Sequence, residues 1–347
     1  MTATALADPQ SAATASTPAI EAVDLVKEFG GFRAVDGVSL TVPTGTVYGV
    51  LGPNGAGKTT TIRMLATLLR ATSGEARIFG HDVRRAPTAV RSLIGVTGQY
   101  ASVDEDLSAT ENLVVFSRLL GLSRRDARRR AAELLEEFNL VEAAARPLKN
   151  FSGGMRRRLD LAASLISAPP LLYLDEPTTG LDPHARTQMW ETIRGLVAGG
   201  STVLLTTQYL DEADQLADRI AVIDHGRVVA DGTADDLKAS IGGSSLQITL
   251  ADPAQSDRAR AIISEALDTP VGVTAESGRL TAPMIDPGQT PELLIHLREH
   301  GITTAELTVQ KPSLDEVFLT ITGTPADSDG ATPGTADAGS AQNGDAA

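Results

Sequence analysis

Short apolar runs alternate with amphipathic stretches along most of the chain, and this alternation predicts its fold. Runs typical of buried strands occupy residues 47–52, 93–99, 171–176, 201–207 and 219–232, the last resembling a hairpin about His225-Gly226. The segment after residue 58 places its apolar positions on one helical face, namely Ile62, Leu65, Ala66 and Leu69. Strands alternating with helices predict an α/β fold, in which a largely parallel sheet is covered by helices on both faces.

Two breaks in this pattern divide the chain. Residues from about 100 to 165 are rich in helical periodicity and predict a helical subdomain within a larger domain at 20–240. One helical stripe there comprises Ala127, Ala131, Leu134, Leu135 and Phe138. After residue 240 the composition changes, and strands and helices ending in a helix from Pro312 predict a small α+β accessory domain at 241–323. The ends, 1–19 and 324–347, are expected to be a disordered arm and a disordered acidic tail.

The bulk composition narrows the class of protein. Of the 347 residues, 42% are hydrophobic, which is enough for a sizeable core. The formal net charge of −14 argues against a nucleic-acid partner, because phosphate backbones are bound by clustered positive charge. No apolar run of about 18 residues occurs, so we expect the chain not to span a membrane by itself. The absence of cysteine excludes disulfides and thiolate zinc sites.

One loop carries the pattern of a phosphate-binding site. Gly52 and Gly57 frame four residues, and Lys58 and Thr59 follow at once, between a predicted strand and a predicted helix. Glycines let successive backbone N–H groups converge on an anion, and the positive end of the following helix points at the same place. Lys58 would reach the outer phosphates, and Thr59 would offer a hydroxyl to Mg²⁺. The residues predicted to bind nucleotide here are Gly52, Asn54, Gly55, Ala56, Gly57, Lys58, Thr59 and Thr60.

Two carboxylates end the apolar run at 171–176. Asp175 and Glu176 would face the ligand crevice, because the C-terminal ends of strands line that crevice in an open α/β sheet. Asp175 would hold Mg²⁺, and Glu176 would orient or deprotonate an attacking water. The phosphate loop alone leaves a kinase, a GTPase, a helicase and a transport ATPase open, and the carboxylate pair narrows this choice. A GTPase is disfavoured, since the chain has no Asn-Lys-x-Asp motif.

Beyond these motifs the chain resembles an ATP-binding-cassette (ABC) ATPase, a transporter's motor subunit, over about residues 20–240. The segment FSGGM at 151–155 is similar to the family's signature, and DEPTTGLDP at 175–183 matches the loop after the magnesium aspartate. Gln99 matches the family's glutamine loop, and Phe29 matches the aromatic residue that stacks on adenine. The resemblance implies ATP and Mg²⁺ as cofactors. The residues predicted at the metal are Thr59, Gln99 and Asp175.

The signature segment also implies a second copy of the chain. Ser152, Gly153 and Gly154 offer a hydroxyl and exposed N–H groups at a predicted helix start, which suits a second anion site. In the family this site meets the nucleotide of a partner, so the resemblance implies a head-to-tail homodimer that sandwiches two ATP molecules. Asp182, in the loop that follows Glu176, is assigned to the nucleotide site as well. A simple helix cap by Ser152 is the plainer interpretation of the same residues.

One position departs from the family pattern. Where the family usually has a histidine after the run at 201–207, this chain has Gln208. A carboxamide can donate a hydrogen bond to a γ-phosphate, but it cannot carry a positive charge. We therefore expect Lys58, Glu176 and Gln208 to be the catalytic residues, with Gln208 as a sensor of the γ-phosphate.

The segment around Gln208 and the sequence SLDEVFLTITG at 313–323 are similar to the ATPase subunits of bacterial daunorubicin-resistance-type drug exporters. This resemblance implies a separate integral membrane permease, gripped by the helical subdomain, and a peripheral position on the cytoplasmic face of the cell membrane. It also implies efflux of a drug or another amphipathic small molecule. An importer motor and a soluble ABC ATPase that does not transport are the alternatives.

Overall fold

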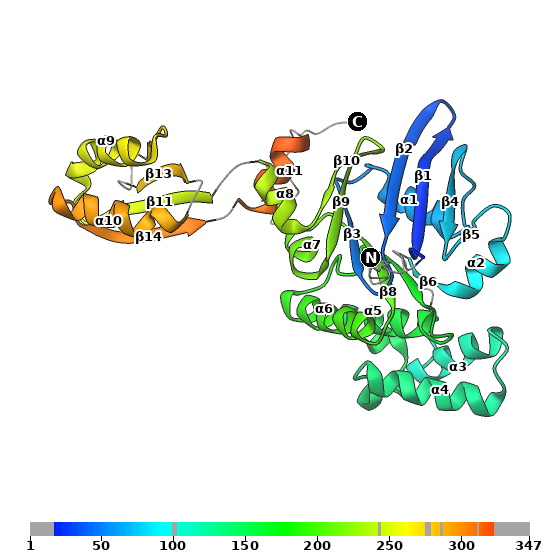
Figure 1. Ribbon diagram of the computed structural model, residues 1–347. Helices are drawn as coiled ribbons and strands as arrows, with labels where there is room; N and C mark the ends of the chain where they lie inside the picture. The colour runs from blue at the N-terminus through cyan, green and yellow to red at the C-terminus, as the bar shows by residue number, and fades with distance from the viewer. Residues whose placement is uncertain are drawn as a thin grey trace, which may run out of the picture.

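In the computed structural model, the described residues form a six-stranded sheet in the order β10-β9-β3-β8-β7-β6 (Figure 1). The structure describes residues 17–98, 103–241, 244–274, 279–284, 287–310 and 312–322. The strands that run parallel are β3 (Val47–Leu51), β6 (Ile94–Thr97), β7 (Leu171–Asp175), β8 (Thr202–Thr207) and β9 (Arg219–Asp224). Every residue of β3, β7 and β8 is buried, as expected for strands covered on both faces. The predicted α/β fold with a largely parallel sheet is confirmed.

The sixth strand of this sheet completes the predicted hairpin. β10 (Arg227–Gly232) pairs antiparallel with β9, and His225 and Gly226 form the turn between them. Both turn residues have positive φ, 46° and 78°, as a tight two-residue hairpin requires. The hairpin predicted about these residues is therefore confirmed.

A second, antiparallel sheet was not predicted from the sequence. It has the order β2-β1-β4-β5. Its strands are β1 (Ile20–Phe29), β2 (Phe32–Val42), β4 (Ser73–Ile78) and β5 (His81–Asp82). One buried cluster joins these strands to helix α1 (Lys58–Leu65) and to one face of the six-stranded sheet, so α1 is covered on both sides. Ala19 belongs to this cluster and its N–H donates to the oxygen of Val42 (2.8 Å), so ordered structure includes the last residue of the predicted N-terminal arm.

Helices cover the opposite face of the main sheet. They are α3 (Ala109–Leu119), α4 (Arg124–Glu137), α5 (Gly153–Ser164), α6 (Pro183–Ala198), α7 (Leu210–Leu216) and two 3₁₀ turns, η1 (Val141–Ala143) and η2 (Leu148–Asn150). Helix α2 (Pro87–Leu93) lies on the side of the antiparallel sheet instead, because its buried Val90 belongs to the cluster of that side. In Figure 1, α3 and α4 lie at the lower end of the molecule, beyond α5. The five residues of the predicted stripe, four on α4 and Phe138 at its end, are buried, with exposed fractions of 0–3%. One cluster joins this stripe to α5, α6 and the sheet.

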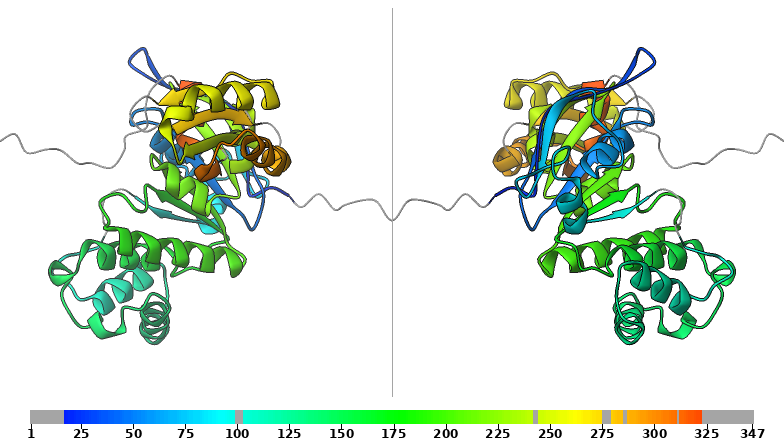
Figure 2. Two further views of the ribbon diagram at one scale, coloured as in Figure 1. Left: turned by 90° about the vertical axis from the view of Figure 1, so that its left-hand side faces the viewer. Right: turned by 90° about the vertical axis from the view of Figure 1, so that its right-hand side faces the viewer.

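Residues 244–310 form a separate unit with its own core, which we call the accessory unit. It is a β-α-β-β-α-β arrangement whose antiparallel sheet has the order β12-β13-β11-β14. Its elements are β11 (Ser244–Leu250), η3 (Pro253–Gln255), α9 (Ser256–Leu267), β12 (Gly272–Thr274), β13 (Arg279–Met284), η4 (Pro287–Gln289), α10 (Thr290–Glu299) and β14 (Thr304–Gln310). Figure 1 shows this unit beside the main sheets, and in the two side views of Figure 2 it lies in front of or behind them, at the opposite end from α3 and α4.

The last helix corrects the predicted domain boundary. α11 (Leu314–Thr322) was grouped with the accessory domain, but its Leu314, Val317 and Phe318 pack against Leu51 and residues of α7 and α8 (Ala234–Ser240). The chain therefore leaves the main body after α8, forms the accessory unit and returns through α11 (Figure 1). The predicted disordered tail at 324–347 lies outside the described residues, as do residues 1–16 of the predicted arm.

Candidate nucleotide site

The predicted phosphate loop joins β3 to α1, and its glycines are required by close backbone contacts. A Cβ atom at Gly52 would lie 2.2 Å from the carbonyl oxygen of Ile223, and one at Gly57 would lie 2.4 Å from that of Ala34. Gly55 and Gly57 have φ of 81° and 105°, in the left-handed region that side chains rarely adopt. Only glycine keeps this loop in its conformation, which leads directly into the N-terminus of α1, where backbone N–H groups suit an anion.

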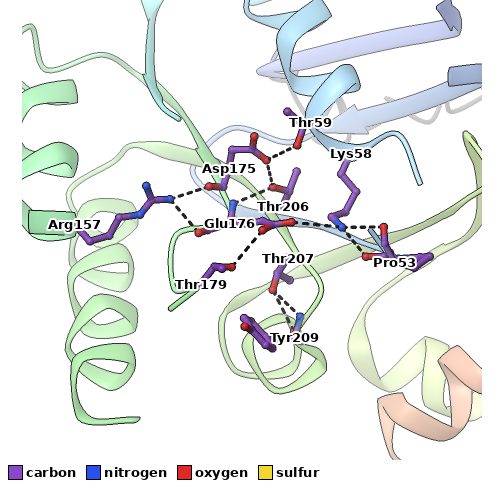
Figure 3. A network of polar contacts seen from close by, with 11 residues as sticks. Pro53, Lys58, Thr59, Arg157, Asp175, Glu176, Thr179, Thr206, Thr207 and Tyr209 are labelled. Atoms are coloured by element: carbon purple, nitrogen blue, oxygen red, sulfur yellow. Dashed lines mark hydrogen bonds and ion pairs between the residues drawn. The ribbon is translucent and has the colours of Figure 1, made fainter. Parts of the chain in front are cut away.

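Lys58, the first residue of α1, is a buried cation at the base of this loop. Its side chain is 4% exposed, and Nζ donates to the carbonyl oxygens of Gly52 (2.6 Å) and Pro53 (3.1 Å). Nζ also lies 3.8 Å from Oε1 of Glu176 (Figure 3). Burial lowers the pKa of the Lys58 ammonium, and the carboxylates of Glu176 and Asp175 oppose that shift.

Asp175 connects the end of β7 to the loop and to β8. Its Oδ1 accepts hydrogen bonds from the hydroxyls of Thr59 (3.1 Å) and Thr206 (2.6 Å), and its side chain is buried (Figure 3). A carboxylate and a hydroxyl oxygen side by side are the hard donors that Mg²⁺ prefers. The donor set of Thr59 and Asp175 therefore fits the predicted metal.

Glu176 is held in an unusual backbone conformation. Its φ is 48°, a left-handed value for a residue other than glycine, and such values gather at functional sites. Its N–H lies 3.1 Å from both the carbonyl and the hydroxyl oxygen of Thr206, and its Oε2 accepts from the hydroxyl of Thr179 (3.3 Å). The carboxylate therefore faces Lys58 and the phosphate loop.

A cavity of about 460 Å³ lies over the loop and joins these groups. It is lined by Phe29, Phe32, Ala34, Glu176 and the loop residues Pro53, Asn54, Gly55, Ala56, Gly57, Lys58, Thr59 and Thr60. The two phenylalanines pair across the β1–β2 turn and are 47% and 66% exposed. Phe29 is thus not a core residue, and a flat ring at the mouth of a phosphate-binding cavity suits a nucleobase.

Comparisons with known proteins agree with this geometry. A family described as ABC transporter matches residues 35–179. The chain is 56% identical to the daunorubicin/doxorubicin resistance ATP-binding protein DrrA of Streptomyces peucetius, over 90% of this chain and 95% of that protein. This chain belongs to the ABC transporter ATP-binding family. A doxorubicin resistance ATP-binding protein of Mycobacterium tuberculosis is 46% identical over 86% of this chain and 91% of its own length.

Solved structures confirm the ABC ATPase fold. An ATP-binding subunit of an ABC transporter is 30% identical with a TM-score of 0.57, covering 64% of this chain and 92% of its own. A dimeric ATP-binding cassette in a post-hydrolysis state, bound to ADP and Pi, is 25% identical with a TM-score of 0.57, covering 62% of this chain and 98% of its own. As an ABC ATPase, the chain binds and hydrolyses ATP. Among the described residues, no helix has both the length and the apolar character needed to cross a membrane.

The signature residues of this ATPase lie at the start of α5, away from the cavity walls. Ser152 is the N-cap of α5, and its hydroxyl accepts a hydrogen bond from the N–H of Met155 (3.3 Å). Within one chain, Ser152 therefore acts as a simple helix cap. Ser152 and Gly153 are exposed. A Cβ at Gly154 would lie 2.8 Å from the Cβ of Ala185, so close packing of α5 on α6 also requires glycine there. Their contact with a second nucleotide stays a prediction.

Two of the remaining predicted residues, Asp182 and Gln208, are not on the wall of the cavity. Asp182 is exposed and caps α6, its Oδ1 accepting from the N–H of Ala185 (2.8 Å). Gln208 follows β8, and its Oε1 is buried without a hydrogen-bond partner among the described residues. Gln99 lies outside the described residues. The roles of these three side chains stay predictions.

Replacing Gln208 with alanine is expected to lower ATP turnover by more than about tenfold, the scale of one lost polar contact to a transition state. Phosphate release from the purified chain measures this rate. The control is Gln247→Ala, because Gln247 bonds Gln310 on the accessory sheet, far from the loop. Unchanged turnover in the Gln208 variant would remove this side chain from the site.

A buried carboxyl in α7 was missed from the sequence. Glu212 is 0% exposed, and neither of its carboxyl oxygens accepts a hydrogen bond from another described residue. It lies beside Thr178, Thr207 and Trp190, with Arg186 near enough to attract it. Burial raises the pKa of Glu212, and these neighbours only partly oppose that shift.

Glu212 therefore makes stability depend on pH. Its pKa is higher in the folded than in the unfolded chain, so the neutral carboxyl favours folding below the ordinary value of 4.5, and this contribution is lost as the pH rises above it. Glu212→Gln keeps the shape without the charge. We expect the melting temperature of this variant, relative to that of the wild type, to rise as the pH increases above 4.5. A difference that stays constant with pH would contradict this.

Two further residues of the site escaped the sequence analysis. Phe32 lines the cavity opposite Phe29, and the pair of aromatics flanking Gly30-Gly31 in EFGGF was the available signal. Arg157 lies one turn into α5 and donates to carbonyl oxygens at the ends of β6 and β7. Nothing in its local sequence distinguishes it from its neighbours Arg156 and Arg158.

Proposed function

We propose that this ATPase is the motor subunit of a drug exporter, which couples ATP hydrolysis to efflux of an amphipathic small molecule through a separate membrane permease. The observation that carries the proposal is the 56% identity with a daunorubicin/doxorubicin resistance protein over 95% of its length. A Nod factor export ATP-binding protein of Sinorhizobium fredii, 38% identical over 90% of its length, supports the direction of transport.

The site would hold ATP with Mg²⁺. The glycine loop and the N-terminus of α1 would receive the phosphates, Lys58 would neutralise their charge, and Phe29 would stack on the adenine. Thr59 and Asp175 would hold Mg²⁺, which supplies charge neutralisation at the β- and γ-phosphates when bound. The side chain of Gln99 would add a ligand, as the family resemblance implies.

Glu176 would act on the attacking water. Its carboxylate would accept a proton from that water while the water oxygen forms a bond to the γ-phosphorus. The bond between the γ-phosphorus and the bridging oxygen breaks, and ADP and phosphate leave. Gln208 would donate a hydrogen bond to the γ-phosphoryl oxygens, in place of the family's histidine.

A second copy of the chain would complete the site. Ser152, Gly153 and Gly154 are not on the wall of the cavity in their own chain, but their position at a helix start suits a phosphate. We propose that two copies pair head to tail, so that these residues of one copy meet the γ-phosphate held by Lys58 of the other. The solved dimer bound to ADP and Pi supports this arrangement.

The permease would dock on the part of the chain that contains α3 and α4. Apolar side chains there are left in solvent, with Val115 46%, Leu119 77% and Leu120 56% exposed. Exposed apolar side chains gathered on one element favour a protein partner over solvent. This contact would hold the ATPase at the cytoplasmic face of the membrane as a peripheral subunit.

The proposal is tested by drug resistance in a sensitive host. Cells that express the chain together with the membrane protein encoded beside it are expected to accumulate less doxorubicin and to grow at higher drug concentrations. Cells with either protein alone, or with Glu176→Gln in place of the wild-type chain, should stay sensitive. Resistance that persists with the Glu176→Gln variant would refute a hydrolysis-driven exporter.

A further inference from the structure

Arg157 joins the helix of the signature to the strands that carry the catalytic carboxylates. Its Nη1 donates to the carbonyl oxygen of Gly98 (2.7 Å), directly after β6. Its Nη2 donates to the carbonyl oxygens of Asp175 (2.8 Å) and Glu176 (3.0 Å), and its Nε donates to that of Pro177 (3.0 Å). One guanidinium thus binds four main-chain oxygens that lie at or just beyond the C-terminal ends of two neighbouring strands. Figure 3 shows two of these contacts, those with Asp175 and Glu176.

The Glu176 peptide is the most constrained part of this contact. The left-handed φ of 48° at Glu176 costs free energy for any residue except glycine, so surrounding contacts must stabilise this backbone conformation. Its N–H is held from one side by Thr206, and its carbonyl oxygen is held from the other by Arg157. With both ends of the residue fixed, the Cα–Cβ bond points the carboxylate toward Lys58, at 3.8 Å.

The chemistry of this contact needs arginine. A guanidinium presents five N–H donors in a rigid planar fork, and four carbonyl oxygens from four different residues can share them. A lysine at the same position keeps the charge but has three donors on a single nitrogen, so it cannot reach both Gly98 and the Glu176 peptide in the same geometry. The contact is therefore specific in shape as well as in charge.

We propose that Arg157 is a positioning residue for hydrolysis, which fixes the backbone of Glu176 so that its carboxylate aims at the water and the γ-phosphate. Arg157 does not line the cavity over the phosphate loop, and it acts through Glu176. Because Ser152 caps the helix that carries Arg157, this contact also connects the signature to the carboxylate of the same chain. This inference rests on the proposed role of Glu176 in the reaction.

The test compares kcat and KM for ATP in Arg157→Lys with those of the wild-type full-length chain. We expect kcat to fall at least about tenfold, since small misplacements of a catalytic group can cost up to about a hundredfold. We expect KM to stay within about threefold and the melting temperature to change little, because the phosphate loop is untouched. Arg157→Gln, which keeps two N–H donors, serves as a second variant in case the first folds poorly.

A matched control is Arg130→Lys. Arg130 of α4 also donates through Nε and Nη2 to two carbonyl oxygens, those of Ile166 (3.3 Å) and Leu165 (2.8 Å), but these follow the far end of α5. The same loss of a guanidinium fork at that end should leave kcat within about twofold of wild type. An equal fall of kcat in both variants would overturn the inference.

A double variant separates this inference from the proposed role of Glu176. If Arg157 acts through Glu176, Arg157→Lys should not lower the residual single-turnover rate of a Glu176→Gln chain further. A further tenfold fall there, or a wild-type kcat in Arg157→Lys alone, would overturn the role of Arg157 and leave that of Glu176 intact. Full turnover in Glu176→Gln alone would instead remove the proposed role of Glu176.

Discussion

Glu176→Gln is expected to lower the ATP turnover of the purified chain by about a hundredfold to ten-thousandfold, the range that one general base contributes. The carboxylate lies 3.8 Å from Lys58 Nζ and lines the cavity over the phosphate loop, so it is placed to accept a proton from a water at the γ-phosphate. Glutamine has the same length and shape but cannot accept that proton. Phosphate release at saturating ATP measures the loss.

ATP binding should survive this change, because Glu176 is not one of the groups that hold the phosphates. We therefore expect the variant to accumulate as an ATP-bound dimer, measured by size-exclusion chromatography with and without ATP. Glu75→Gln is the matched control, since the Glu75 side chain is 71% exposed on β4 and pairs with Arg77. Wild-type turnover in Glu176→Gln would contradict the assignment of the base.

Lys58→Ala is expected to weaken ATP binding by about a hundredfold to a thousandfold and to abolish turnover. Hydrogen bonds to charged groups contribute about 1.5–3 kcal/mol, and Lys58 would serve two phosphate groups in a buried place where charges interact strongly. Its side chain is 4% exposed, so water would compensate poorly for the lost cation. Titration with a fluorescent ATP analogue measures the affinity.

Two control measurements accompany this prediction. Lys149→Ala removes an exposed lysine that pairs with Asp106, and it should leave the affinity unchanged. Because Lys58 Nζ also bonds Gly52 and Pro53, the melting temperature of Lys58→Ala must be measured to show that the loop still folds. Retained ATP affinity in a folded Lys58→Ala chain would place the triphosphate somewhere other than this loop.

The family membership separates the alternatives that the motifs left open. A phosphate loop and a strand-end carboxylate pair are shared by several classes of nucleotide hydrolase, whereas the FSGGM segment resembles the signature of ABC ATPases. Two relatives that cover 90% and 91% of this chain are named for resistance and for export, and these names favour neither an importer motor nor a soluble ABC ATPase. The cargo is the part of the proposal that depends most on the permease.

The central sheet and the phosphate loop could be predicted because their signals are local. A buried parallel strand reads as an unbroken apolar run, and Gly52, Gly57, Lys58 and Thr59 lie within eight consecutive residues whose spacing is dictated by the anion they bind. The same holds for the stripe on α4 and for the turn at Gly226. Each needs only the geometry of one element.

The antiparallel sheet, the return of α11 and the contact of Arg157 were not predicted, because each depends on partners distant in the chain. β1 pairs with β4 across more than forty residues, and Arg157 bonds Gly98 across 59. Phe318 is apolar in any arrangement, and only packing against Leu51 and α7 decides which unit it joins. For Gly154, the sequence indicates only a signature residue, and the close packing against Ala185 gives a second reason why this position is glycine.

Residue types at short spacing therefore specified which chemistry this chain can perform: a phosphate loop, a carboxylate pair and a helix that starts with serine and glycine. The folded chain alone decided how these parts are aimed, through the buried Lys58, the left-handed Glu176 and the fork of Arg157 between two strand ends. The reason is physical, because spacing fixes contacts within one element, whereas direction at a site is set by hydrogen bonds and packing between elements that meet only after folding.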